Sequence, residues 1–498
     1  LTETSGSFTA DSITSDSQIS ASTVNGSVSI ESTGNITLSN ITAGTSSATI
    51  ETTNGSINDN AVDSTSDITA DTITLSATAG IGNSDAIEIS SANTISATTS
   101  GSQSIDIDHV ADAATTISSL TQTGTGNINF DQTGGQSLTF SGTASTSNGN
   151  IVISNDNAVS LATTSVTGNL SLTSSGAITD TGTTTVSGTT TIAAGASNNI
   201  TLDTTSNNFN SLVITSGNNV VIEDSNAIDI SASAVSGTLS VTAGGDITDS
   251  GNLVVNGDVT LITDANNGVI NLGSLQQSTG DLVVTTNGTG DATVVNNVGI
   301  DFGASNVGGN LAVTATTGNI TQNGGALTVA GTSALTTSAD DALITLSNTS
   351  NALTGALTVT TNGSTGNVVI DNGTTALDFA ASTIDGSLSA RSGHASGITD
   401  SGNLVVNGDV TLTTDDNNGV INLGTLQQST GDLLLTTNGT GNAAVVNNVG
   451  IDFGASNVGG NLAVTTTTGN ITQNGGALTV AGTSVFTTAA DGSNIILD

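Results

Sequence analysis

The sequence predicts an all-β fold, a parallel β-solenoid (β-helix) in which short strands stack coil upon coil. Three observations predict it. A repeat runs through the 498 residues, apolar and polar residues alternate over short stretches, and Pro, Trp and Tyr are absent. Self-similarity at a fixed period is the signature of solenoids and related repeat folds. The repeat is the strongest of the three observations.

The repeat has two levels. Residues 247–333 recur almost unchanged at residues 398–484, an offset of 151 residues. A shorter signature consists of an apolar anchor, Val or Ile five positions later, and Leu or Val four positions further. It defines about seven repeats of roughly 72 residues, which predicts a single continuous solenoid over residues 1–498. The anchors are Ile19, Ile89, Leu161, Ile230, Phe302, Phe379 and Phe453.

The anchors are expected to face the core in equivalent coils of successive repeats. Each repeat is expected to form about three coils, with two or four left open by the uneven internal spacing. The chain starts at Leu1 without a signal peptide, so we expect it to be an excerpt of a longer protein.

Short alternating stretches predict the strands. Residues 311–313, 327–329 and 357–359 alternate apolar and polar side chains, and Gly, Asn, Asp, Ser and Thr separate such stretches. No stretch has a helical period, so essentially no α-helix is expected. Stacked turns predict ladders of Asn and Thr, for which the pairs 266–267 and 417–418 are candidates.

A string of β-sandwich domains is the alternative architecture. Each sandwich must close its own core, usually with a large buried aromatic residue and Pro-marked turns. The chain has eight Phe and no other aromatic residue. In a solenoid, neighbouring coils cover the small aliphatic residues of each coil, and an absence of Pro keeps every interior N–H available. The composition therefore favours the solenoid.

The charge excludes several classes of partner. The chain has 41 acidic residues and one basic residue, a formal net charge of −40, and no Cys. Nucleic acids and anionic membranes are excluded because both require clustered Lys and Arg. No apolar run is long enough for a transmembrane helix, so no membrane insertion is expected.

Two stretches resemble a known family. Residues 168–180 (GNLSLTSSGAITD) and 237–251 (GTLSVTAGGDITDSG) are similar to the repeats of filamentous-haemagglutinin-like exoproteins of the two-partner secretion type. The resemblance implies a right-handed parallel β-helix, export through an outer-membrane pore, and an extracellular adhesin or fibre on a bacterial surface. Nothing in the chain resembles the N-terminal secretion domain of that family.

Catalytic chemistry has few candidate residues. His109 follows Asp106 and Asp108, which share one strand face, and this group is either an acid–base or metal site or a solvated face. His394 is distant in sequence, and Arg391 is interpreted as a surface turn residue. With one Arg and no Trp or Tyr, the chain is expected to have no catalytic residue and no certain cofactor.

Acidic turns give the candidate metal ligands. The turn at residues 263–268 recurs at residues 414–419, and its Asp and Asn oxygens suit Ca²⁺. The same residues also cap turns through their side-chain oxygens, and the sequence favours this second interpretation. The calcium candidates are Asp264, Asn266, Asp415, Asp416 and Asn417.

These observations favour a non-enzymatic, structural segment of an extracellular bacterial fibre or adhesin. Its expected partners are further copies of itself, end to end or laterally, and a host or cell-surface glycan. A carbohydrate-active or carbohydrate-binding β-helix module is the alternative. A carboxylate cluster that interrupts the repeat would favour the alternative, whereas uniform repeats favour the fibre.

Overall fold

The computed structural model of the chain describes residues 2–3, 6–13, 17–264, 267–415 and 418–498. Secondary structure in these residues is β, from β1 (Thr2–Glu3) to β54 (Ile495–Ile496), and none of them is in an α-helix. The described residues accordingly contain no helix that could cross a membrane. The chain divides into an N-terminal unit, Leu1–Ala243, and a C-terminal unit, Gly244–Asp498.

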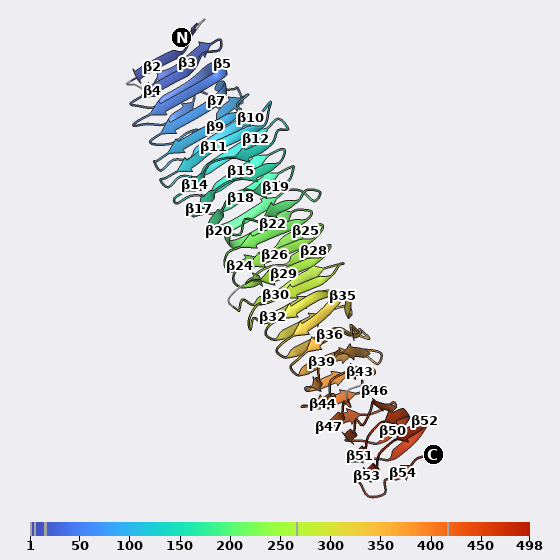
Figure 1. Cartoon of the computed structure of the whole chain (residues 1–498). Coiled ribbons are helices and arrows are strands. Elements are labelled where there is room, and N and C mark those ends of the chain that lie inside the picture. Colours follow the sequence, from blue (N-terminus) through green and yellow to red (C-terminus); the bar gives the residue numbers. More distant parts are fainter. Residues whose placement is uncertain (1, 4–5, 14–16, 265–266, 416–417) are drawn as a thin grey trace. The chain divides into compact units, whose positions relative to one another are not determined.

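Each unit is a parallel β-solenoid, in which strands stack in successive layers (Figure 1). A strand pairs with strands one coil earlier and one coil later, as Ile128 pairs with both Ile105 and Ile151. Paired residues lie from 18 to 27 residues apart in the chain. The predicted all-β solenoid is confirmed for each unit. Its continuity over residues 1–498 stays a prediction.

One column of strands in the N-terminal unit joins the anchors Ile89 and Ile230. Seven successive pairings lead from the strand of Ile89 to that of Ile230. Leu161, the anchor between them, lies in β16 (Val159–Leu161) on another column, above β13 (Leu138–Phe140). The column consists of β8 (Ile87–Ser90), β10 (Ile105–Val110), β12 (Ile128–Thr133), β15 (Ile151–Asn155), β18 (Leu170–Ser174), β20 (Thr184–Ala193), β22 (Asn208–Ser216) and β24 (Ile228–Ile230).

The C-terminal unit has the same arrangement between Phe302 and Phe453. Seven pairings again join the two strands that carry these anchors. Phe379 lies in β41 (Leu377–Phe379) on a different column, where it pairs with Leu357. The column that joins the two anchors consists of β33 (Ile300–Val307), β35 (Ile320–Val329), β37 (Ile344–Leu346), β40 (Val368–Asp371), β43 (Leu388–Ser392), β46 (Val410–Thr414), β48 (Leu433–Thr437) and β50 (Ile451–Val458).

Between Ile89 and Ile230, and between Phe302 and Phe453, seven coils accommodate two repeats, so a repeat there occupies three and a half coils. The first repeat occupies three coils, because three successive pairings join the strand of Ile19 to that of Ile89. The expectation of about three coils per repeat is therefore confirmed for the first repeat and half a coil short for the later ones. The expectation that anchors of successive repeats occupy equivalent positions holds for Ile19 and Ile89 and is wrong for Leu161 and Phe379.

The core consists of the side chains that point inside the coils. All seven anchors are buried, Ile19 at 8% exposed and the others at 1% or less, as the sequence predicts. The role of the neighbouring coil is visible in β35 and β52 (Ile471–Val480), which have the same ten residues. Val329 of β35 is fully buried and pairs with Leu353 of the following coil. Val480 of β52 is partly exposed, and it has no partner on a following coil among the described residues. Each coil completes the core of its neighbour.

Side-chain ladders connect the turns. The Asn127 Oδ1 accepts the backbone N–H of Asn150 at 2.9 Å, Asn150 Oδ1 accepts that of Asn169 at 2.7 Å, and Asn169 Oδ1 accepts that of Thr189 at 2.8 Å. The predicted turn ladders are confirmed at Asn267 and Asn418, which accept N–H groups one coil later at 2.9 Å and 2.8 Å. Their neighbours Asn266 and Asn417 lie outside the described residues.

Candidate functional site

The N-terminal unit has an enlarged turn after β6 (Ile57–Asp59). Leu38 pairs with Asp59, and Ile41 pairs with Ile68. The chain advances three residues from Leu38 to Ile41 but nine residues from Asp59 to Ile68. The second coil therefore contains an insertion of six residues at this place. The inserted residues form an exposed loop that interrupts the repeat.

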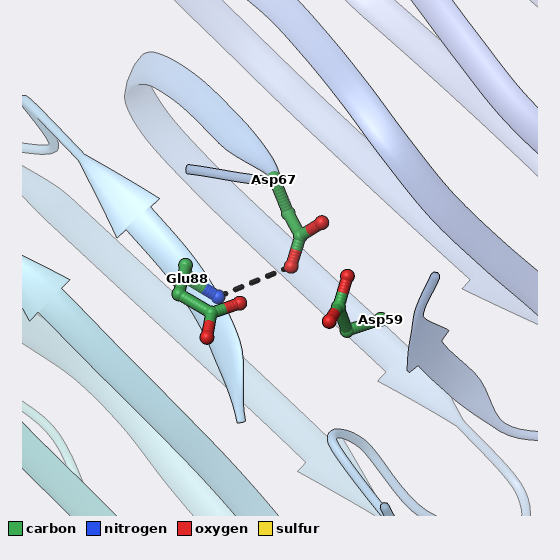
Figure 2. A group of neighbouring side chains, drawn as sticks. All are labelled: Asp59, Asp67 and Glu88. Atoms are coloured by element: carbon green, nitrogen blue, oxygen red, sulfur yellow. Dashed lines mark hydrogen bonds between the residues drawn. The ribbon is translucent and has the colours of Figure 1, made fainter. Parts of the chain in front are cut away.

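Three carboxylates gather where this loop leaves and rejoins the coil. Asp59, Asp67 and Glu88 each offer one oxygen, and these oxygens lie within 4.8 Å of one another (Figure 2). We call these three residues the acidic cluster. The backbone holds it in place, because the Glu88 N–H donates to Asp67 Oδ2 at 3.2 Å and the Asp67 N–H donates to the Glu88 carbonyl at 2.8 Å. The Asp59 Oδ2 also accepts the N–H of Ala61 at 3.1 Å.

Burial makes this cluster electrostatically unusual. Asp67 is 2% exposed and Glu88 8% exposed. Burial raises the pKa of Asp67 to about 9, with the carboxyl groups of Asp59 and Glu88 as further causes. Burial also raises the pKa of Glu88 above its ordinary value. The Glu88 Oε2 is buried and has no hydrogen-bond partner in the described part of the chain.

Further carboxylates continue from Glu88 across the neighbouring coils. Asp108 pairs with Glu88 in the ladder, and Asp131 pairs with Asp108. These three residues line one pocket together with Ser66 and other side chains. Although the Asp108 side chain is exposed, partial desolvation of its carboxylate raises its pKa, and the nearby charge of Asp131 adds to the rise. Stacked like charges destabilise a sheet, so this face of the solenoid favours a bound positive charge.

His109 is a core residue. Its side chain is 1% exposed and points to the opposite face from Asp106 and Asp108, which share the outer face as the sequence predicts. The His109 Nδ1 lies 3.1 Å from Gln132 Oε1, and its Nε2 accepts the Ala92 N–H at 3.3 Å. Burial lowers the pKa of His109, so the neutral ring that these two contacts require is favoured. The structure does not bring this histidine together with the two aspartates.

Arg391 is the only basic side chain of the sequence, and it bridges two carboxylates. Its Nη1 lies 2.8 Å from Asp371 Oδ2, and its Nη2 lies 2.8 Å from Asp415 Oδ2. These hydrogen bonds raise the pKa of Arg391, with Asp371 the largest cause. Interpreting Arg391 as a surface turn residue was wrong, because it belongs to strand β43 and pairs there with Asp371.

The predicted calcium ligands are only partly described. Asp264 is exposed, and its backbone carbonyl accepts a hydrogen bond from Asn287 Nδ2 at 2.7 Å. Asp415 uses its carboxylate to bind Arg391. Asn266, Asp416 and Asn417 lie outside the described residues. Calcium binding at these five positions stays a prediction. His394 is exposed in a turn, where its Nδ1 accepts the Ser396 N–H at 3.0 Å.

Comparison with known proteins concerns the repeats. A family model described as repeats of unknown function (DUF5649) matches residues 148–216, 217–286, 289–360, 365–436 and 440–498. The chain belongs to the DUF5649 repeat family. Each matched DUF5649 repeat contains one of the predicted anchors, from Leu161 to Phe453. No curated protein and no solved structure matches the chain.

The acidic cluster lies before the first matched DUF5649 repeat, and sequence reasoning missed it. Two signals could have indicated it. Apolar alternation lapses between Ile57 and Ile68, with an Asp at each end of the gap, and the spacing after the anchor Ile89 is longer by one residue. Nothing in the sequence around Glu88 pointed to the cluster. Glu88 lies beside Asp67 because of the pairing register between strands, which the sequence does not show.

Proposed function

We propose that the chain is a structural, non-catalytic β-solenoid segment of an extracellular bacterial surface fibre or adhesin. The observation that carries this proposal is the construction of the core. Within each unit, the anchors are covered by the coils on either side, and the column pattern returns after seven coils. A core that is completed by the next coil can be extended by adding repeats, which suits a stiff structural element.

The resemblance of residues 168–180 and 237–251 to filamentous-haemagglutinin-like repeats supports the more specific part of the proposal. On this basis the chain is exported through an outer-membrane pore and displayed on the cell surface. Its partners there are further copies of itself and surface glycans. Protease treatment of intact cells tests this location, since a displayed segment is removed while cytoplasmic proteins are spared.

The use of the aromatic residues supports a non-catalytic role. Sugar-processing β-helix enzymes usually present aromatic rings as platforms for the substrate. Here six of the eight Phe side chains are fully buried, at Phe130, Phe140, Phe209, Phe302, Phe379 and Phe453. Many turn Asp and Asn side chains cap backbone N–H groups of the next coil, as Asp291 does for Asn310 at 2.7 Å. Both residue types are therefore used to build the solenoid.

A carbohydrate-active module is the second candidate, because the acidic cluster does interrupt the repeat. Its geometry differs from that of glycosidases, whose two carboxyl groups lie about 5–5.5 Å or about 6.5–9.5 Å apart on either side of the sugar. The three oxygens of the cluster lie within 4.8 Å. Hydrolysis of bacterial or host polysaccharides by the purified chain, lost in Glu88→Gln, would favour this candidate over the structural one.

Electron micrographs of the purified full chain test the structural proposal. We expect elongated particles, with fibres at higher protein concentration. Small-angle X-ray scattering gives the same distinction in solution. Discrete globular particles in the micrographs would contradict the proposal, as would a scattering curve of a compact particle.

A further inference from the structure

We propose that the acidic cluster of Asp59, Asp67 and Glu88 binds one oxygen-coordinated divalent cation, and we take Ca²⁺ as the ion to test. The inference concerns a part of the chain that precedes the matched repeats. It does not depend on the fibre or adhesin role, and the cluster shares no residue with the turns where the sequence predicts calcium.

The spacing of the oxygens fits such an ion. Ca²⁺ takes carboxylate oxygens at about 2.3–2.6 Å, so two oxygens on one ion lie up to about 5 Å apart. The oxygens offered by the three carboxylates lie within 4.8 Å of one another. Figure 2 shows the three side chains converging from separate segments of the chain. An ion between them would contact all three after only small movements.

Glu88 supplies the second observation. Its side chain is 8% exposed and extends into the cluster, and its Oε2 is buried without a hydrogen-bond partner among the described residues (Figure 2). Buried carboxylate oxygens are normally satisfied by a donor or a metal ion, because an unpaired buried charge is costly. By contrast, the buried carboxylate of Asp224 accepts the N–H groups of Phe209 and Asn226. The Asp85 Oδ2 is also buried without a partner among the described residues, and its charge acts on Glu88.

The chain itself offers no cation to this site. Its single Arg is Arg391, in the C-terminal unit, where it is already paired with Asp371 and Asp415. Ladder neighbours of Glu88 add further negative charge through Asp108 and Asp131. A divalent ion satisfies Glu88 Oε2 and neutralises the cluster at the same time.

Binding of a cation should depend on pH. Carboxylate ligands bind a metal ion in their deprotonated form, so binding should release any proton that the cluster holds and strengthen as the pH rises. Because Asp59 and Asp67 lie at the two ends of the inserted loop, a bound ion would also tie both ends of the loop to β8.

Calorimetric titration of the full chain with CaCl₂ tests the proposal, at pH 7.5 and 0.15 M NaCl so that diffuse binding to the other carboxylates is screened. We expect one saturable site per chain, with a dissociation constant of about 10⁻⁴–10⁻³ M. Proton release is measured by repeating the titration in buffers of different ionisation enthalpy. Mg²⁺ in place of Ca²⁺ tests whether the site selects the larger ion.

Two variants identify the site. Glu88→Gln and Asp59→Asn should each weaken the saturable binding at least about tenfold, since each removes one of three charged ligands. Asp63→Asn is the matched control, because Asp63 is an exposed carboxylate of the same loop outside the cluster. It should bind as the wild type does. Circular dichroism in EDTA checks that each variant keeps its β structure.

Two results would overturn the proposal. One is a wild-type titration without a saturable component, which would mean that the cluster is satisfied by its proton alone. The other is saturable binding that persists in Glu88→Gln and Asp59→Asn but disappears in Asp264→Asn, which would assign the ion to the repeat turns. Neither result bears on the elongated particles that test the structural role.

Discussion

Two regions of the molecule bring carboxylates of stacked coils close together and differ in how the charge is compensated. In the C-terminal unit, Arg391 lies between Asp371 and Asp415 with N–O distances of 2.8 Å. In the N-terminal unit, Asp67 and Glu88 lie beside Asp59 with no basic side chain in the sequence to serve them. In a parallel ladder, strands lie about 4.8 Å apart, so acidic residues in register are forced together. Where such residues are also buried, their charge requires a cation or a proton.

The repeats show that the arginine is a local solution. At the corresponding place one pair of repeats earlier, Glu223 pairs with Thr242, whereas Asp371 pairs with Arg391. The fold is the same with either residue. The solenoid therefore forms with or without an arginine at this position, and the comparison predicts what happens when either kind of compensation is removed.

Arg391→Thr should have the largest effect on stability. It leaves Asp371, whose side chain is 12% exposed, without its cation. Removing one partner of a buried pair costs about 3–5 kcal/mol. Because the Arg391 side chain is 43% exposed, we expect a smaller loss of about 2 kcal/mol. Urea unfolding followed by circular dichroism measures it.

Adding Asp371→Asn to Arg391→Thr provides the control, because it removes the charge that the arginine compensates. The double variant should recover much of the loss. If it is as unstable as Arg391→Thr alone, the arginine acts through packing of its side chain, and its comparison with the acidic cluster fails.

Asp67→Asn should have the next largest effect, and the effect should depend on pH. The pKa of Asp67 is raised to about 9 by burial, with the carboxyl groups of Asp59 on β6 and Glu88 on β8 facing it. Between about pH 4 and pH 9 the folded chain holds a proton that the unfolded chain has released. The contribution of Asp67 to stability is complete below pH 4 and is lost as the pH rises through 9.

Asparagine cannot ionise, so Asp67→Asn should gain on the wild type as the pH rises. In EDTA, the unfolding free energy of Asp67→Asn relative to that of the wild type should rise by more than about 1 kcal/mol from pH 4 to pH 8. A shift of one pKa unit corresponds to about this free energy. Asp63→Asn, in the exposed part of the same loop, should show no comparable trend. Parallel pH profiles for the wild type and Asp67→Asn would show that Asp67 is ionised in the folded chain.

Turn caps should respond to loss of the acceptor and not to loss of charge. Asn310 Oδ1 accepts the Thr332 N–H at 2.8 Å, and Asp291 Oδ1 accepts the Asn310 N–H at 2.7 Å. Asn310→Ala should cost about 0.5–1.5 kcal/mol, the net value of a hydrogen bond. Asp291→Asn, which keeps an acceptor, should be neutral or slightly stabilising. A large loss in Asp291→Asn, measured by urea unfolding, would indicate that the turn aspartates have a role that needs their charge.

General screening of the charge should have the smallest effect. With a net charge of −40, the folded chain repels itself. Added NaCl should raise the melting temperature of wild type and Arg391→Thr by a few degrees, and CaCl₂ should do so at lower concentration. A flat response in a titration from low salt would show that the carboxylates are too dispersed along the coils to interact.

Much of the fold could be predicted from the sequence, because the structural repeat of a solenoid is also a repeat of the sequence. The anchors, the inward faces and the turn ladders follow from spacing alone. About three coils per repeat could be predicted, but the extra half coil of the later repeats could not, because it depends on which strands pair and not on the residues of one repeat. Phe302 and Phe379 have similar sequence contexts and lie on different columns.

The candidate site was less predictable. Asp59 and Glu88 are 29 residues apart in the sequence. Asp67 joins them only because the six-residue insertion forms a loop that returns the chain to the ladder beside Asp59. Arg391 was visible as an exception to the composition, but its partners Asp371 and Asp415 lie 20 and 24 residues away and depend on the coil length. The register of the strands decides which residues of neighbouring coils are in contact. Because turn lengths vary from coil to coil, this register cannot be derived from the spacing of residues in the sequence.

One measurement tests most directly whether carboxylates on neighbouring coils require a cation. Asp108→Arg places a guanidinium in the ladder between Glu88 and Asp131, as Arg391 lies beside Asp371. Asp108 is exposed, so the longer side chain has room. Asp108→Asn separates the loss of a negative charge from the gain of a positive one. Melting in EDTA at pH 7.5, with and without added CaCl₂, is the readout.

We predict that Asp108→Arg melts about 1–2 °C above Asp108→Asn in EDTA, the shift expected for about 1 kcal/mol when roughly 250 to 500 residues unfold together. The further rise on adding Ca²⁺ should be smaller in Asp108→Arg than in the wild type, because the arginine replaces the ion. Equal melting temperatures for the two variants in EDTA, with an unchanged response to Ca²⁺, would contradict the account.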